Sequence, residues 1–174
     1  LGRIGDSSVT GALVKRLEDD DAKVRSRAAI ACGRIGDPRA VEPLEAQLER
    51  ESDIEVRKAA VEALGEIGTE GALTVLLENA GDPDEAVRHV VADSLGAFWS
   101  VSPVETLVEY LEDDYEAVRR TAMFSMVEIL SNAPPQRSHE VREATADRLD
   151  AARAGKVIPP LAEILTDSSG TPQR

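Results

Sequence analysis

A valine followed by an arginine returns along the chain at an almost constant interval. The pairs begin at Val24, Val56, Val87, Val118 and Val141, and the first four are 32, 31 and 31 residues apart. A bulky apolar residue or a thiol follows each valine after eight residues. These residues are Cys32, Leu64, Leu95, Met126 and Leu149. Because independent offsets keep the same phase, the chain is a tandem repeat of about 31 residues.

Each repeat contains two segments with the apolar spacing of an amphipathic helix. Val41, Leu44 and Leu48, three and four residues apart, mark a first helix. The second helices are expected at about 24–35, 56–67, 87–98 and 118–129, and small residues near their start allow close packing. Acidic turns precede them, where aspartate caps a helix. Gly36 and Gly68 are placed to end them in a left-handed conformation.

The repeat determines the fold class, because one helix pair cannot bury its apolar face alone, whereas stacked copies can. We predict an all-α fold, a right-handed α-solenoid (α-α superhelix) of about four helix-pair repeats with a degenerate C-terminal cap. The single solenoid is expected over 1–166, with repeats at about 6–36, 37–68, 69–99 and 100–130, a degenerate unit at 131–166 and a frayed tail at 167–174. The chain begins in the middle of a repeat, so we expect an N-terminus truncated within one.

The degenerate unit is shorter than the others. Only 15 residues separate Met126 from Val141, which removes most of a first helix. We expect a proline-rich linker over 131–138, a helix from about His139 to Ala154 that resumes the phase of the second helices, and a last helix from about Pro159 to Leu165. Trp99 takes the position of a turn glycine in the preceding repeat.

Two runs carry a resemblance to a known family. Residues 82–88 read DPDEAVR and residues 60–68 read AVEALGEIG. The pattern resembles the HEAT-repeat family, in the short subtype first associated with phycobilisome lyases. It covers residues 1–130 well and 138–166 more loosely. The resemblance implies the solenoid fold strongly and a function weakly, because many unrelated proteins use such repeats.

Charge and composition limit the function classes. The chain carries a formal net charge of −13, which argues against nucleic-acid binding. Sixteen arginines stand against four lysines, which favours a halophilic source over an ordinary acidic protein. No apolar run is long enough for a membrane span, and we expect a cytoplasmic protein. Five aromatic residues argue against a deep cofactor pocket.

The arginines of the Val-Arg pairs allow two interpretations, an anion-binding row or a structural ladder. In the ladder each arginine pairs with the acidic turn before its helix or with the neighbouring turn. Aspartates lie four residues before three of these arginines. We favour the ladder, whose predicted members are Arg25, Arg57, Arg88, Arg119 and Arg142 with Asp21, Asp53 and Asp84.

No residues form a convincing catalytic or metal site, and we predict no enzyme, no cofactor and no metal. Deoxyhypusine hydroxylase, a HEAT-like enzyme, binds two irons through several His-Glu pairs, whereas this chain has one, His139-Glu140, and only one other histidine, His89. Cys32 falls at a core position and is expected to be buried. The aspartate runs are expected to be caps and solvated turns, with adventitious cation binding left open.

The remaining signal is the exposed face of the second helices. Residues two, three, six and ten after each valine point away from the core, and the resemblance places this face on the concave side. We predict that it binds a partner through Arg27, Ile30, Arg34, Lys58, Glu62, His89, Val90, Asp93, Arg120 and Phe124. The alternative for Phe124 is packing under the altered last unit, and Trp99 is a second candidate anchor.

We therefore predict a non-enzymatic scaffold that binds another protein, of unknown identity, on this face. The alternative is a bilin lyase-like or chaperone-type accessory factor for a chromophore or cofactor protein, which rests on the resemblance. A DNA-repair HEAT protein would need a more basic face. The predicted partners include no nucleic acid and no membrane, and a homo-oligomer through the exposed solenoid ends is left open.

Overall fold

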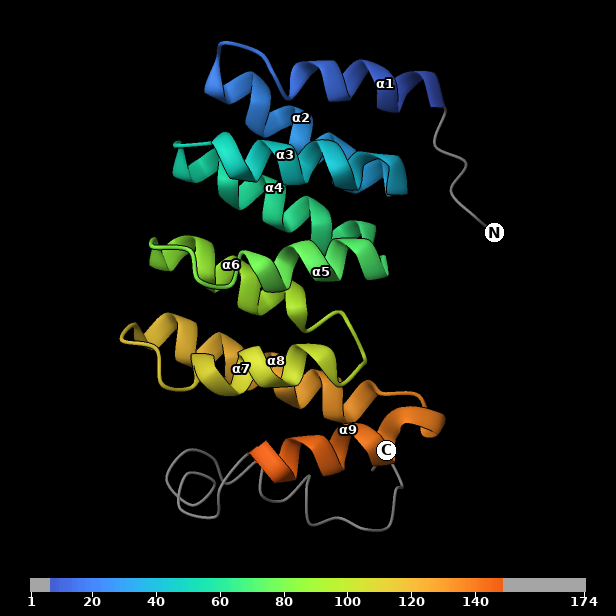
Figure 1. The fold of residues 1–174 in the computed structure, drawn as a ribbon, viewed down its shortest axis with the longest axis vertical. Helices are drawn as coiled ribbons and strands as arrows, with labels where there is room; N and C mark the ends of the chain where they lie inside the picture. The colour runs from blue at the N-terminus through green and yellow to red at the C-terminus, as the bar shows by residue number, and fades with distance from the viewer. Residues whose placement is uncertain (1–6, 149–174) are drawn as a thin grey trace. The chain divides into compact units, whose positions relative to one another are not determined.

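The computed structural model describes residues 7–148 of the chain, and these residues contain helices and no strand, as the repeat predicts. The helices of the described residues are α1 (Ser7–Arg16), α2 (Ala22–Ile35), the 3₁₀ turn η1 (Pro38–Ala40), α3 (Val41–Arg50), α4 (Ile54–Ile67), α5 (Glu70–Glu78), α6 (Glu85–Leu95), α7 (Ser102–Tyr110), α8 (Glu116–Asn132) and α9 (Pro135–Arg148). Figure 1 shows their order along the chain. The expected last helix at 159–165 and the tail lie outside the described residues.

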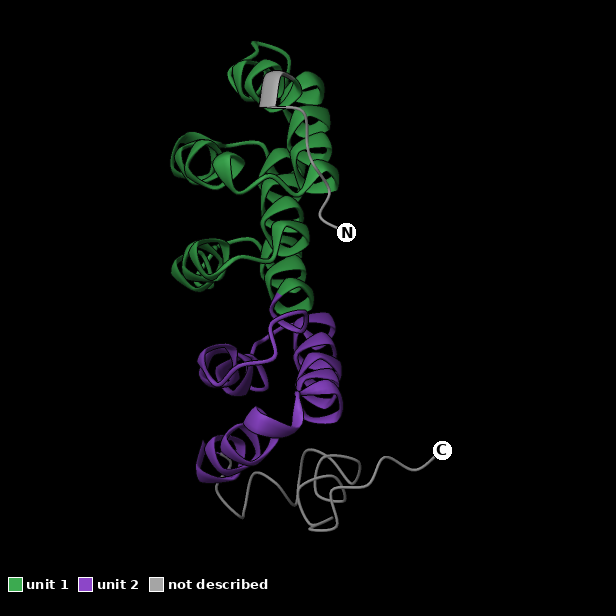
Figure 2. Cartoon of the chain, turned by 90° about the vertical axis from the view of Figure 1, so that its right-hand side faces the viewer, with its two compact units in different colours: residues 1–94 green, residues 95–174 purple. Residues whose placement is uncertain are grey.

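The chain divides into two compact units, residues 1–94 and residues 95–174 (Figure 2). Unit 1 contains α1 to α5 and α6 up to Ser94, and unit 2 contains α7, α8 and α9. A single solenoid was predicted over residues 1–166, without this division.

In unit 1 the helices form two layers. The second helices α2 and α4 lie along one another, and the first helices α3 and α5 lie in the other layer (Figures 1 and 2). The pairing of α2 with α4 is the most extensive between helices of this unit. Between the layers lie side chains that are fully removed from solvent, among them Cys32, Leu44, Leu64 and Leu76. These are the apolar positions that the repeat marked as core.

The helix ends follow the predicted turn chemistry. The Asp21 carboxylate accepts the Lys23 N–H at 2.8 Å at the start of α2. Gly36 and Gly68 end α2 and α4 with φ of 68° and 66°, where a residue without Cβ has no steric penalty. The next repeat has Trp99 in place of this glycine, and α6 ends at Leu95, three residues before its expected end.

Two further glycines allow the second helices to approach closely. A Cβ on Gly33 of α2 would lie 2.7 Å from the Ala63 Cα of α4, and a Cβ on Gly65 of α4 would lie 2.8 Å from the Ser94 Cβ of α6. Close packing was predicted at the small residues near the start of these helices, and this contact nearer their ends was not predicted. The signal that reveals it is the glycine that directly follows the buried residue in three copies, after Cys32, Leu64 and Leu95.

Unit 2 corrects the expected form of the degenerate repeat. The linker predicted over 131–138 is much shorter, because α8 continues to Asn132 and α9 begins at Pro135. A proline fits the first turn of a helix, where its missing N–H has no partner to lose. The helix α9 packs against α7 more extensively than against α8 and lies in the layer of α7 (Figures 1 and 2). It therefore takes the place of a first helix, and Val141 does not continue the row of second helices.

Candidate interaction surface

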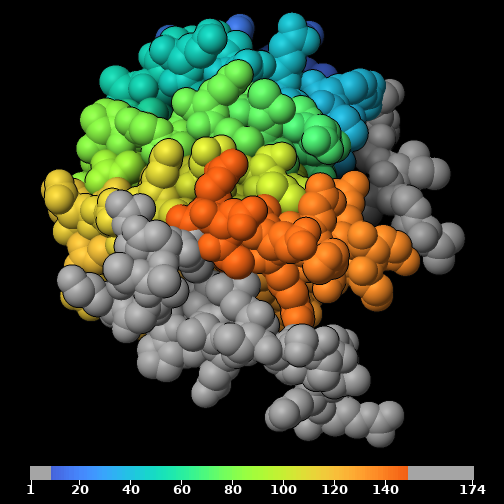
Figure 3. Space-filling view, turned by 60° about the horizontal axis from the view of Figure 1, so that its bottom comes forward, coloured from blue at the N-terminus to red at the C-terminus, as the bar shows by residue number. Residues whose placement is uncertain are grey.

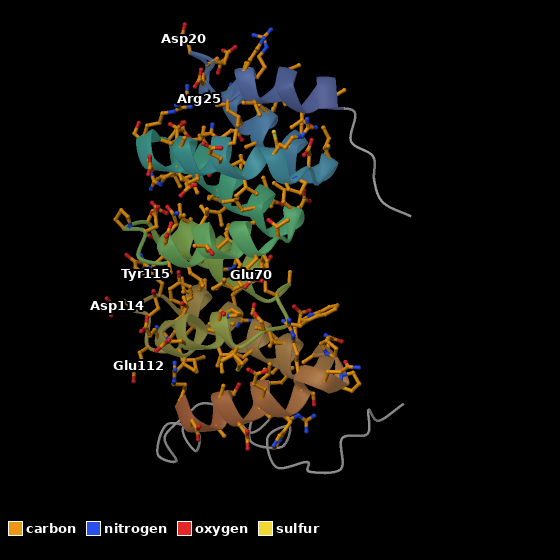
Figure 4. All side chains as sticks on the ribbon, turned by 45° about the vertical axis from the view of Figure 1, so that its right-hand side comes forward. Asp20, Arg25, Glu70, Glu112, Asp114 and Tyr115 are labelled. Atoms are coloured by element: carbon orange, nitrogen blue, oxygen red, sulfur yellow. The ribbon has the colours of Figure 1, made fainter. Side chains whose placement is uncertain are left out.

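The arginines of the Val-Arg pairs join successive acidic turns in unit 1. Arg25 donates from Nε and Nη2 to the Glu51 carboxylate at 2.7 and 3.0 Å, and from Nη1 to the carbonyl oxygens of Asp19 and Asp20 at 2.8 and 3.1 Å. Figure 4 shows Arg25 and Asp20 near the N-terminal helices of unit 1. Arg57 repeats the arrangement with the Asp82 carboxylate, at 2.9 and 3.2 Å. Each arginine thus holds the turn before its own helix to the next turn.

The hydrogen bonds from arginine Nη1 to carbonyl oxygens of the preceding turn recur in both units. Arg88 Nη1 donates to the Asp82 carbonyl oxygen at 2.9 Å, and Arg119 Nη1 donates to the Asp113 carbonyl oxygen at 2.6 Å. Arg142 lies on α9, in the layer of α7, and not on a second helix.

The three aspartates named as ladder partners cap helices. The carboxylates of Asp21, Asp53 and Asp84 accept backbone N–H groups two residues ahead, at 2.8, 2.9 and 2.9 Å. The carboxylates that pair with Arg25 and Arg57 instead come from Glu51 and Asp82, two residues before a capping aspartate. Spacing along one helix favoured the nearer aspartates, whereas the long arginine side chain reaches the neighbouring turn.

Hydrogen bonds to these carboxylates shift their titration. The Arg25 guanidinium holds the pKa of Glu51 below its ordinary value, against the opposing effect of burial, and the N–H groups of Ser52 and Asp53 add to the lowering. In unit 1 the Arg39 side chain and the Thr10 hydroxyl likewise hold the pKa of Asp37 far below its ordinary value. Both carboxylates are structural anions.

The residues predicted for the partner-binding face are mostly exposed. On unit 1 the side chains of Ile30, Lys58 and Val90 are half-buried. The exposed members are Arg27, Arg34, Glu62, His89 and Asp93 on unit 1, and Arg120 and Phe124 on unit 2. The structure therefore leaves two stretches of second-helix surface, one on each unit, open to solvent.

The surface of unit 1 is divided by charge. Helix α2 contains four basic residues and no acidic one, in a chain whose net charge is −13. Helix α4, packed beside it, exposes Glu55, Glu62 and Glu66, and Lys58 Nζ binds the Glu55 carboxylate at 3.0 Å. A basic helix thus lies next to one that is mainly acidic.

The aromatic residues of the chain all fall between residues 98 and 124. Phe98 and Tyr110 are buried, whereas Trp99, Tyr115 and Phe124 are 48%, 47% and 56% exposed. Tyr115 lies at the acidic turn before α8, close to Asp114 (Figure 4). Unit 2 therefore carries exposed aromatic side chains of the kind that anchors protein interfaces. The orange-red surface in Figure 3 is helix α9 of this unit.

Phe124 is exposed on the surface of α8. It lies on α8 with Arg120 one turn before it and Glu128 one turn after it, and both of those side chains are exposed. The helix thus exposes a large apolar ring between two opposite charges.

The metal-ligating side chains within residues 7–148 do not cluster into a site. No group of three or more His, Cys, Asp or Glu residues in this range could hold a metal ion. His139 lies exposed on α9, with Nε2 3.3 Å from a carboxylate oxygen of Glu143. Cys32 is fully buried, and burial raises the pKa of its thiol to about 11. None of the described helices is long and apolar enough to cross a membrane.

Comparison with known families decides the fold family. The family model for HEAT repeats matches residues 1–53 and 41–128. The chain belongs to the HEAT-repeat family. This confirms the resemblance drawn from the DPDEAVR and AVEALGEIG runs, and with the helical structure it confirms the predicted all-α class of HEAT-like solenoids.

Two curated relatives share these HEAT repeats. A deoxyhypusine hydroxylase of Eremothecium gossypii is 37% identical over 86 residues, which are 49% of this chain and 27% of that protein. A HEAT repeat-containing taxis protein of Halobacterium salinarum is 44% identical over 48 residues, which are 28% of this chain and 12% of that protein. The matches thus span 27% and 12% of the lengths of these relatives and concern the repeats.

Solved structures show the same HEAT-like fold. An engineered protein aligns with a TM-score of 0.60 at 24% identity, over 82% of this chain and 68% of its own. The complex of CpcE and CpcF of phycocyanin lyase from Nostoc sp. PCC7120 aligns with a TM-score of 0.57 at 23% identity, over 79% of this chain and 65% of the matched chain. At these identities the likeness establishes fold alone.

Proposed function

We propose that the chain is a non-enzymatic HEAT-repeat scaffold that binds a partner protein on the exposed faces of its second helices. The observation that carries the proposal is Phe124, 56% exposed on α8 between Arg120 and Glu128. A large apolar side chain held in water by a helix stabilises nothing in the free protein. Buried in an interface, it releases water and anchors the contact.

The framework around Phe124 suits rigid presentation. Val118, Ala122, Met126 and Ile129 of α8 are buried with at most 1% exposure, so the opposite side of the helix is held by the core. A side chain presented from a packed helix loses little conformational freedom on binding. The arginine bonds between acidic turns give unit 1 a comparable rigidity, because each arginine fixes two turns at once.

The accessory-factor alternative draws on the likeness to the CpcE and CpcF complex. That likeness is one of fold, and a groove for a bilin would be expected to gather aromatic side chains. The exposed aromatic residues here are spread over the segment before α7, the turn before α8 and the middle of α8. The relative named as a taxis protein supports a role as a signalling scaffold only in general terms, because the match covers 12% of that protein.

The test compares two charge insertions at apolar residues that are both exposed. Phe124→Asp removes the proposed anchor, whereas Val9→Asp changes a 45% exposed residue on the first helix α1. Affinity capture from a lysate of the source organism, followed by mass spectrometry, should recover a defined protein with the wild type and with Val9→Asp. Recovery should fall at least tenfold with Phe124→Asp, since a hot-spot residue contributes about 2 kcal/mol or more.

Circular dichroism controls for folding, and both variants should retain the helical spectrum. Equal recovery with Phe124→Asp and the wild type would refute the assignment of α8 as the binding face. Turnover of a captured small molecule by the purified chain would refute the non-enzymatic role.

A further inference from the structure

A shallow hollow lies on the surface of unit 1 between α2 and α4. Its volume is about 270 Å³, enough for one side chain of a partner. It is lined by Ala22, Lys23, Ser26 and Arg27 from α2 and by Asp53 and Glu55 from the start of α4. The hollow thus brings two cations and two carboxylates to the edge of the basic helix described above.

The two carboxylates already have partners. Asp53 caps α4 and accepts the N–H groups of Glu55 and Val56 at 2.9 and 3.3 Å. The Glu55 carboxylate accepts both of its hydrogen bonds from Lys58 Nζ, at 3.0 and 3.3 Å. Both carboxylates therefore already accept hydrogen bonds from groups of α4, and Glu55 is paired with a cation.

The two cations are differently placed. Lys23 and Arg27 are exposed, and neither side chain forms an ion pair within the part of the chain that the structure describes. Arg25, between them in sequence, turns away to bind Glu51. With the Ser26 hydroxyl, the α2 side of the hollow offers hydrogen-bond donors without a matching acceptor.

We propose that this hollow receives an acidic side chain from the partner protein, with its carboxylate between Lys23 and Arg27. The inference rests on the proposed scaffold function and specifies the chemistry of the partner at unit 1. It is carried by charge complementarity, because α2 has only basic charges and the nearby carboxylates are engaged.

The basic surface is narrow, because it is confined to α2, and it therefore suits a short acidic segment of a protein. Helix α4, directly beside α2, exposes Glu62 and Glu66, so positive charge does not extend across the face. A nucleic acid presents phosphates along its whole length and would meet these carboxylates and the net charge of −13. A single run of acidic side chains meets α2 alone.

The test uses a fluorescein-labelled peptide of eight glutamates as the probe, with fluorescence anisotropy in about 20 mM salt, where charges are weakly screened. The double variant Lys23→Glu with Arg27→Glu reverses the charge of the two cations that line the hollow. The double variant Lys15→Glu with Arg16→Glu, on the exposed end of α1, reverses two charges elsewhere and has the same net charge. A labelled DNA of eight nucleotides tests the competing ligand.

The peptide should bind the wild type and the α1 variant with dissociation constants within about twofold, and the α2 variant at least about fivefold more weakly. Equal weakening by both double variants would show a long-range effect of net charge and overturn the proposal. So would the absence of peptide binding, or DNA binding that depends on Lys23 and Arg27 to the same degree. If the peptide does not bind while recovery of the partner from the lysate still depends on Phe124, the proposal for the hollow is wrong and the proposed scaffold function stands.

Discussion

Replacement of Gly33 by alanine tests how closely the second helices pack. The added Cβ would lie 2.7 Å from the Ala63 Cα and 3.1 Å from the Ala63 Cβ of α4. The first distance is about 0.7 Å short of the 3.4 Å at which ordinary contact begins. The Glu66 Oε2, at 2.5 Å, belongs to a flexible side chain and can move away, but the backbone of Ala63 can yield only if α2 and α4 separate.

The magnitude follows from two opposing terms. Forcing a methyl group into a packed helix contact costs about 1–3 kcal/mol, because neighbouring contacts between α2 and α4 are lost as the helices separate. Alanine is better than glycine inside a helix by up to about 1 kcal/mol. We therefore expect Gly33→Ala to lower the free energy of unfolding by about 1–2 kcal/mol. For a chain of this length the melting temperature should fall by about 2–8 °C.

Gly11→Ala on α1 is the matched control. A Cβ there would meet no atom within 4 Å, so only the gain in helix propensity remains. This variant should be more stable than the wild type by about 0.5–1 kcal/mol. Urea denaturation followed by circular dichroism at equal protein concentrations measures both, with the slope m compared first to check that cooperativity is unchanged. Gly33→Ala at or above wild-type stability would refute the close approach of α2 and α4.

Two further predictions concern Glu51 and Cys32. Because Arg25 holds the pKa of Glu51 below its ordinary value of 4.5, the pair stabilises the fold fully above that pH and loses its effect as the pH falls through the lowered pKa. The stability difference between wild type and Glu51→Gln should therefore shrink in urea titrations from pH 6 to pH 3, and a difference that grows on acidification would contradict the assignment. The thiol of Cys32, fully buried with its pKa raised to about 11, should resist Ellman's reagent near pH 8 in the native protein and react once the chain is unfolded. Rapid reaction of the native protein would show that the core around α2 opens.

The capping and turn chemistry could be predicted from the sequence because it depends on a few adjacent residues. Asp21 and Asp53 before their helices, and Gly36 and Gly68 after them, do what their side chains or lack of Cβ require. The burial of Cys32 and its equivalents was equally accessible, since a fixed period places every copy on the same face.

Contacts between repeats were not accessible in the same way. Spacing suggested Asp21 as a partner for Arg25 and left the neighbouring turn open. The guanidinium binds Glu51, 26 residues away, because the neighbouring turn lies within reach of the long side chain. Three-dimensional proximity also makes Gly33 and Gly65 contact points and brings Lys23 and Arg27 to the same hollow as Asp53. None of these pairs is close in the sequence.

The repeat in the sequence by itself determined the helical content, the phase of the core and the family. The tertiary structure decided the layer of α9, the division into two units and the exposure of Phe124. The reason is physical: periodic burial and helix caps are local properties that one copy of a repeat carries. The place of a terminal helix and the exposure of a side chain depend on which neighbours pack against it, and in an imperfect repeat those neighbours differ from the consensus.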